Sequence, residues 1–187
     1  MNNWGWGMNP VEIIQKYYPV ASEAYRILVK HSRSVADKAV LIGRAHPEWR
    51  LDMQFVEEAA MLHDIGAFLC YAPEIDCHGE AAYICHGYLG AELLRKEGFP
   101  RHALVCERHT GTGLTPAMIE WHNLPIPHRD MRPQSMEEQL ICFADKFYSK
   151  TKLDEEKSIE KIRASMVKYG EASVLQFDNW HKHFLGK

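Results

Sequence analysis

Two adjacent residues, His63 and Asp64, are the strongest candidates for chemistry in this sequence. A neutral imidazole and a carboxylate are both good ligands for a divalent cation, and neighbouring residues can share one ion. The pair lies in the apolar run 59–66, where a carboxylate without a partner is costly to bury. Asp64 therefore needs either a cation or a dense set of hydrogen-bond donors.

More residues of the same types lie on both sides of this pair. His31 precedes it, and Asp145 follows an apolar stretch far downstream. His86 begins a His-Gly-x-x-Gly-Ala segment and His109 begins a His-Thr-Gly segment. An ordered set of imidazoles and carboxylates is what a hydrolytic centre with one or two metal ions requires. For His86 and His109, a structural role in stabilising turns is the alternative.

In type and order, these residues resemble the HD superfamily of metal-dependent phosphohydrolases, and Leu62-His63-Asp64-Ile65-Gly66 looks like its HDIG variant. The resemblance runs from about Lys30 to Lys150. It implies a first metal ion, with positions open to water and substrate, that is held by His31, His63, Asp64 and Asp145. The two histidine segments also resemble members with a dinuclear site, including the symmetrical diadenosine tetraphosphate hydrolases. In that case His86 and His109 bind a second ion and Asp64 bridges the two.

Phosphate chemistry also needs positive side chains close to the metal. Arg108 adjoins His109 and Lys146 adjoins Asp145, so both are candidate catalytic residues, with solvent-exposed charge as the alternative for each. Asp64 is the candidate for orienting the attacking water. Weaker candidates for binding phosphate are Arg33, Arg129 and Arg132.

Residues of the segment 66–84 are candidates for shaping the site. His78-Gly79 repeats the dipeptide of His86-Gly87 without the Gly-Ala continuation, which favours a lid residue over a ligand. Three aromatic residues could stack on a base or pack in the core, namely Phe68, Tyr71 and Tyr83. The chain contains no G-x-S-x-G motif, which disfavours a serine nucleophile.

Together the candidate residues favour a phosphohydrolase in which water bound to the metal attacks phosphorus, since coordination lowers the pKa of the water. The expected cofactor is one or two divalent ions of iron, manganese, cobalt, nickel or zinc. The expected substrate is a small phosphorylated molecule, a nucleotide or dinucleotide, with mono- or diester or pyrophosphate cleavage left open. A nucleotide-binding regulatory module without turnover is the alternative, and a di-iron oxygenase is a weaker one.

Composition predicts one domain over residues 1–187, with a core at about 30–150 and flanking N- and C-terminal helices. A net charge of −3 argues against a nucleic-acid polymer as partner.

No run approaches the roughly 20 apolar residues of a membrane span. The first residues lack the features of a signal peptide, and the five cysteines form no C-x-x-C pair, so a cytoplasmic protein is expected. The oligomeric state stays open.

Apolar residues recur with a period near 3.6, which predicts an all-α fold, a compact HD-domain helical bundle. Asp52 and Ser135 are expected to cap helices, the second with Glu138 three residues on. The stretches 66–84 and 123–133 are expected to form a broken loop over the site and a surface loop. Helices are expected at 10–17, 20–29, 31–46, 53–62, 88–97, 100–108, 115–122, 135–145 and, as the last one, 154–169.

Overall fold

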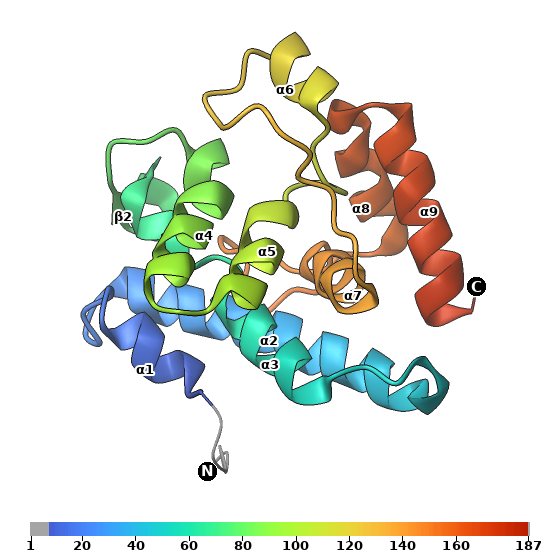
Figure 1. Ribbon diagram of the computed structural model, residues 1–187, viewed down its shortest axis with the longest axis horizontal. Helices are drawn as coiled ribbons and strands as arrows, with labels where there is room; N and C mark the ends of the chain where they lie inside the picture. Colours follow the sequence, from blue (N-terminus) through green and yellow to red (C-terminus); the bar gives the residue numbers. More distant parts are fainter. Residues whose placement is uncertain (1–7, 187) are drawn as a thin grey trace.

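The computed structural model describes residues 8–186. In this range the chain forms α-helices joined by 3₁₀ turns and one short antiparallel ribbon, which confirms the all-α prediction (Figure 1). The helices are Pro10–Gln15 (α1), Glu23–Ala45 (α2), Met53–Leu62 (α3), His86–Lys96 (α4), Pro100–Arg108 (α5), Pro116–Trp121 (α6), Met136–Asp145 (α7), Ile159–Met166 (α8) and Glu171–Leu185 (α9). The 3₁₀ turns are Pro47–Trp49 (η1), Ile65–Leu69 (η2), Pro73–Ile75 (η3), Tyr83–Cys85 (η4) and Val167–Tyr169 (η5), and the strands are Tyr71–Ala72 (β1) and Cys77–His78 (β2).

Polar side chains begin most of these helices. Each accepts a hydrogen bond from a backbone N–H of the first turn, which has no partner inside the helix. The predicted caps Asp52 and Ser135 act in this way on α3 and α7. The other capping side chains are Asn9, Ser22, Thr115 and Ser158. The start of the chain, whose composition argues against a signal peptide, lies outside the described residues.

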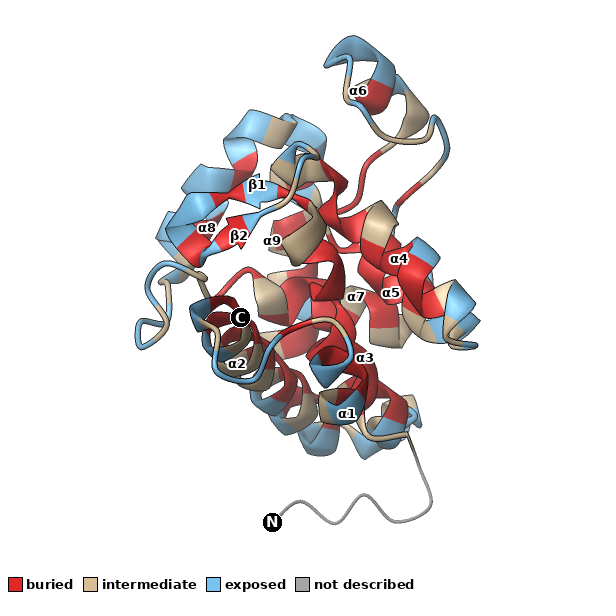
Figure 2. Cartoon of the chain, turned by 90° about the vertical axis from the view of Figure 1, so that its left-hand side faces the viewer, coloured by how far each residue is buried: buried red, intermediate tan, exposed pale blue. Residues whose placement is uncertain are grey.

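The central layer of the fold consists of α2, α3 and α7, and the pair α4 and α5 packs across it (Figure 1). Helix α3 buries seven of its ten residues, among them Phe55, Val56 and the apolar run 59–62. Figure 2 shows buried residues along α3, α4, α5 and α7 in the middle of the molecule, whereas α6 stands away from the body. Within the described residues, no helix combines the length and the apolar character that a membrane span requires.

Three glycines allow the elements around the site to touch. A Cβ atom on Gly66, in η2, would collide with the backbone of α4 at His86 and Gly90. A Cβ atom on Gly87 would lie 2.8 Å from the Cys106 carbonyl oxygen of α5. The glycines that follow His86 and His109 in the sequence could let the backbone pass close to a metal or phosphate. Instead, Gly66, Gly87 and Gly90 let η2, α4 and α5 approach one another, because glycine has no side chain to separate them.

Two expected boundaries are wrong. Residues 20–29 and 31–46 do not form two helices, because α2 runs through both without a break. The expected last helix, 154–169, is only the shorter α8 with η5, and a further helix, α9, follows it. Helix α9 packs on α7 through Phe177 and Phe184, whose rings contact Phe143. The broken segment 66–84 agrees with the prediction, since it holds only 3₁₀ turns and the two short strands.

Candidate metal centre

Five helices bring the six candidate ligands together. His31 lies within α2, and Asp145 ends α7. His63 follows the last residue of α3 and is followed by Asp64. His86 begins α4, and His109 follows the last residue of α5. All six are buried except Asp145, which is partly exposed.

The first ligand group consists of His31, His63, Asp64 and Asp145. The Nε2 atom of His31 lies 3.2 Å from Asp64 Oδ2 and 3.1 Å from Asp145 Oδ1. The Nε2 atom of His63 lies 2.9 Å from the same oxygen of Asp64 and 3.4 Å from Asp145 Oδ1. Two imidazoles and two carboxylates therefore face one point.

The second ligand group consists of Asp64, His86 and His109. The other carboxylate oxygen of Asp64, Oδ1, lies 3.2 Å from His86 Nε2 and 3.4 Å from His109 Nε2. The two imidazole Nε2 atoms are 3.0 Å apart. Asp64 thus belongs to both groups and presents one oxygen to each, which is the arrangement of a bridging carboxylate.

Backbone carbonyls fix the orientation of three of the imidazoles. The Nδ1 atoms of His63, His86 and His109 lie 2.6–2.7 Å from the carbonyl oxygens three residues before them. Nδ1 must therefore carry a proton and donate it, which turns Nε2 toward the aspartates as the atom that can bind a metal when the ring is neutral. Hydrogen bonds of this kind are the usual support of histidines that bind metals.

These donor atoms fit a cation. Among residues 8–186, His63 Nε2 and Asp64 Oδ1 are buried without a hydrogen-bond partner, and Asp64 Oδ2 forms an ion pair with Lys150 but no hydrogen bond. Burial lowers the pKa of His109 to about 4, so this imidazole is neutral and its lone pair faces that of His86. Two lone pairs at this distance repel unless a positive ion lies between them. Imidazole and carboxylate ligands suit divalent transition metals.

Comparison with known proteins agrees with this geometry. A family model described as the HD domain matches residues 28–149, most of the chain. The chain belongs to the HD-domain family. An uncharacterised protein of Methanocaldococcus jannaschii is 32% identical to this HD protein over 128 residues, which are 67% of this chain and 68% of the relative.

Two further proteins resemble this chain in part of the sequence or in the fold. A tRNA (cytidine(56)-2'-O)-methyltransferase of Picrophilus torridus is 30% identical over 124 residues, 66% of this chain but only 32% of that enzyme. The crystal structure of the HD domain of the L. monocytogenes phosphodiesterase PgpH superposes with a TM-score of 0.53 at 17% identity, covering 92% of this chain and 95% of that one. At this identity the superposition shows a shared HD fold.

Two lysines neutralise the carboxylates of the HD centre. Lys146 Nζ lies 2.8 Å from Asp145 Oδ2 and donates to the His109 carbonyl oxygen. Lys150 Nζ lies 2.6 Å from Asp64 Oδ2. Burial opposes ionisation of both aspartates, but the positive charges of these lysines and the adjacent histidines hold their pKa values well below the usual range. The metal-free centre is therefore balanced by ammonium groups.

Lys150 lies at the site, although it was not among the site residues predicted from the sequence. It follows Asp145 by five positions in a segment without regular structure, where no periodicity shows which way a side chain points. Lys146, by contrast, lies at the HD centre as predicted. Arg108 lies beside the centre in sequence, but its guanidinium pairs with Glu138 at 2.9 Å. Its catalytic role stays a prediction.

The other candidates lie outside the ligand groups. His78 is exposed and contacts Asp76. Phe68 packs against Tyr17 and Tyr18, and Tyr71 is exposed. The weaker arginine candidates pair with acidic residues close to them: Arg33 with Glu57, Arg129 with Glu107, and Arg132 with Asp130. Only Tyr83 of the three aromatic candidates lines the pocket described next.

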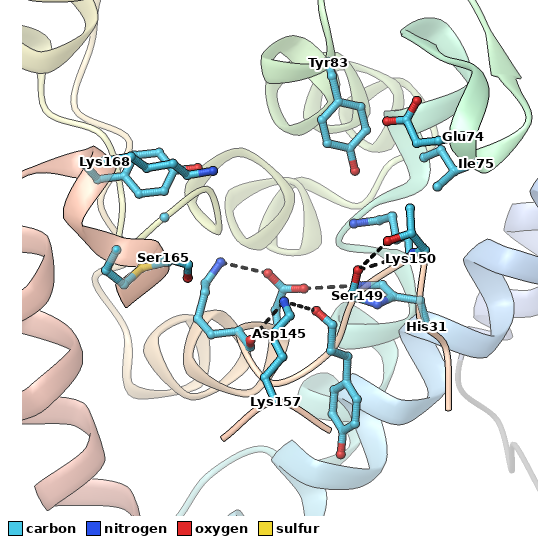
Figure 3. Close-up of a pocket in the computed structure, with 16 residues that line it drawn as sticks. His31, Glu74, Ile75, Tyr83, Asp145, Ser149, Lys150, Lys157, Ser165 and Lys168 are labelled. Atoms are coloured by element: carbon cyan, nitrogen blue, oxygen red, sulfur yellow. Dashed lines mark hydrogen bonds and ion pairs between the residues drawn. The ribbon is translucent and has the colours of Figure 1, made fainter. Parts of the chain in front are cut away.

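A pocket of about 360 Å³ opens onto the first ligand group (Figure 3). His31 and Asp145 form part of its wall, together with Lys146 and Lys150. Tyr83 lies on one side of the pocket with its ring stacked on His86, at a centroid distance of 4.6 Å. Glu74 and Ile75 line the same side, and residues of α8 and η5 line the opposite side.

Proposed function

We propose that this HD protein is a metal-dependent phosphohydrolase that acts on a small phosphorylated substrate, a nucleotide or dinucleotide. The observation that carries the proposal is the convergence of four imidazole Nε2 atoms on two carboxylates, with Asp64 presenting one oxygen to each ligand group. Family membership supports the same activity, because the HD resemblance implies a metal-dependent phosphohydrolase. The methyl-transfer activity in the name of the longer relative is not carried over, since the match spans only 32% of that enzyme.

Bound divalent metal would supply positive charge and a water of lowered pKa. The chain's own residues would do the rest. Asp64 has acceptor capacity left on its carboxylate and can orient a water molecule. Lys150 lines the pocket with its ammonium group beside Asp64, so it can contact the reacting phosphoryl group. Lys146 is held by Asp145 and the His109 carbonyl oxygen, so its charge keeps these ligands in place.

The size and walls of the pocket support a small substrate. At about 360 Å³ it lies near the lower end of ordinary ligand pockets, which span roughly 300–1,000 Å³. It holds both carboxylate and ammonium groups, which suits a phosphorylated molecule better than an apolar one. Tyr83 adds an aromatic side chain to its wall, where a base could pack.

Elemental analysis and a substrate screen test this proposal. Protein purified without chelators should contain transition metal and should cleave p-nitrophenyl phosphate, its bis ester or a nucleotide, with the activity lost after chelation and restored by one of the five candidate metals. Tight nucleotide binding without any turnover would instead favour the regulatory module. Turnover of sugar phosphates alone would show that the proposed nucleotide substrate is wrong and that the proposed hydrolase activity is right.

A further inference from the structure

The wall of the pocket opposite Glu74 and Tyr83 comes from a part of the chain that the HD family model does not cover. The match to the family model ends at residue 149, whereas the pocket is also lined by Lys157, Ser165, Lys168 and Tyr169. Figure 3 shows Lys157 beside Asp145, with Ser165 and Lys168 across the pocket from Lys150. This wall therefore lies outside the part of the chain that the HD family model matches.

The two lysines of this wall differ from the two at the metal centre. Lys146 and Lys150 are paired with Asp145 and Asp64. Lys157 and Lys168, in contrast, have no carboxylate within ion-pair distance among the described residues. Neither ammonium group is therefore paired directly with a carboxylate at the pocket.

Lys157 has bonding capacity left for a ligand. Its Nζ atom donates to the carbonyl oxygens of Tyr148, at 2.8 Å, and Lys146, at 3.4 Å. An ammonium group has three N–H donors, so one remains. Burial lowers the pKa of Lys157, the negative charge of Asp145 opposes this shift, and the positive charges of Lys146, Lys150 and Lys168 add to it. An anion would relieve this repulsion.

Lys168 is held at the pocket by the residue that follows it. The Tyr169 ring packs on Gly111, where an added Cβ would lie 3.2–3.3 Å from ring atoms, and the Lys168 ammonium lies 4.9 Å from the centroid of the same ring. Gly111 belongs to the His109-Thr110-Gly111 segment. The contact therefore joins η5 to the metal-ligating segment and fixes which side of the pocket Lys168 occupies.

We propose that Lys157 and Lys168 form a subsite for a second phosphoryl group, so that the preferred substrate carries two phosphoryl groups and only one of them reacts at the metal centre. The subsite deepens the proposed function and rests on it. A second dianionic group at this wall would accept charge-assisted hydrogen bonds from both ammonium groups, which are about twice as strong as neutral ones. A phosphomonoester with an uncharged remainder would leave the same ammonium groups unpaired.

Calorimetric titration of protein stripped of metal by chelation and dialysis tests the subsite without turnover. Methylenediphosphonate, a non-hydrolysable diphosphate analogue, should bind at least about tenfold more tightly than methylphosphonate. The double variant Lys157→Met/Lys168→Met should lose this preference. Lys168→Met alone should lose part of it, and because this side chain is exposed the single variant should fold normally.

The matched control is Lys161→Met, which removes the same charge from an exposed position on α8 outside the pocket. It should keep the preference. Equal binding of the two phosphonates by the wild type, or equal loss in the control, would overturn the subsite. Failure of the wild type to cleave any phosphoester would overturn the proposed function instead, and the binding titration separates the two results.

Discussion

At the scale of single residues, Asp64 is the one on which both ligand groups depend. Its Oδ2 atom faces His31 and His63, and its Oδ1 atom faces His86 and His109. Loss of any histidine would remove a ligand from one group, whereas loss of Asp64 removes a ligand from both. The buried carboxylate is also what holds Lys150 at the centre.

Replacement Asp64→Asn should remove bound metal and lower turnover more than about 100-fold, because even residues that only support a metal ligand cost about 10–100-fold. The amide keeps the shape of the side chain and loses its charge. Elemental analysis, steady-state kinetics and the helical circular dichroism spectrum measure the three expected results. Asp37→Asn, on the exposed surface of α2, is the control and should change none of them. Full activity of Asp64→Asn would contradict the metal-hydrolase proposal.

His109→Ala tests the second ligand group. Wild-type protein should bind two equivalents of metal and this variant about one, because the first ligand group does not contain His109. The rate should fall strongly, since a two-metal centre stabilises both the attacking and the leaving oxygen. The exposed His122→Ala is the control. A wild-type stoichiometry of one would reduce the proposal to a mononuclear centre.

Metal binding should release a proton from His63. Burial opposes the charged ring, but Asp64 and Asp145 raise the pKa of His63 to about 9 in the metal-free protein. At pH 7 this imidazole is therefore protonated, and it must be neutral to bind metal. The apparent metal affinity should rise about tenfold per pH unit from pH 7 to near 9 and then level off. Calorimetry in two buffers of different ionisation enthalpy measures the released proton, and an affinity independent of pH would contradict the prediction.

The six candidate ligands lie in one cluster, and the motifs could identify them because each belongs to a short segment with a fixed neighbour: a second candidate ligand, a glycine or an apolar helix face. Lys150 has no such neighbour. Its approach to Asp64 depends on how the chain leaves α7, which local sequence does not determine. Arg108 shows the reverse case. It was a candidate because it adjoins His109 in the sequence, but in the structure its guanidinium pairs with Glu138.

At the scale of elements, Gly66 sets the distance between η2 and α4. Gly66→Ala should lower the free energy of unfolding by about 1–3 kcal/mol, the usual cost of an overpacked core. Its Cβ would meet backbone atoms, which cannot move aside as a flexible side chain can. Because η2 follows Asp64 directly, the metal content should fall as well.

Urea denaturation and elemental analysis measure these two effects. Gly98→Ala is the control. It introduces backbone strain without a steric contact, because Gly98 has a φ of +87° and no atom lies near the position of an added Cβ. The control should lose some stability and keep its metal. Normal metal content in Gly66→Ala would show that this close approach does not position Asp64.

Helix starts were predictable and helix continuity was not. Asp52 and Ser135 cap α3 and α7 because a short polar side chain meets an orphan N–H group in the first turn. The expected boundary between residues 29 and 31 contains neither glycine nor proline, so α2 continues through it. Helix α9 could have been found from Phe177, Trp180 and Phe184, which recur at helical spacing and bury one face against α7.

At the scale of the whole molecule, metal should contribute to stability, because it binds only the folded chain. A free metal concentration of 100 times the Kd raises the free energy of unfolding by about 2.7 kcal/mol. This corresponds to a rise in Tm of roughly 5–10 °C for a chain of this length. Thermal melting with and without chelator measures the shift. Asp64→Asn should melt at the same temperature in both conditions, and an equal shift in that variant would place the stabilising metal elsewhere.

The dispersion of the ligands along the chain has a consequence for folding kinetics. His31 and Asp145 stand near opposite ends of the HD segment, and the other ligands come from three further helices. No short stretch of chain can therefore hold the ion, and the centre exists only after all five helices have docked. Metal should then slow unfolding while leaving the folding rate nearly unchanged, since it stabilises contacts that form late. Cells that run short of the ion would lose this protein through faster unfolding of molecules already made, and newly synthesised chains would still reach the folded state.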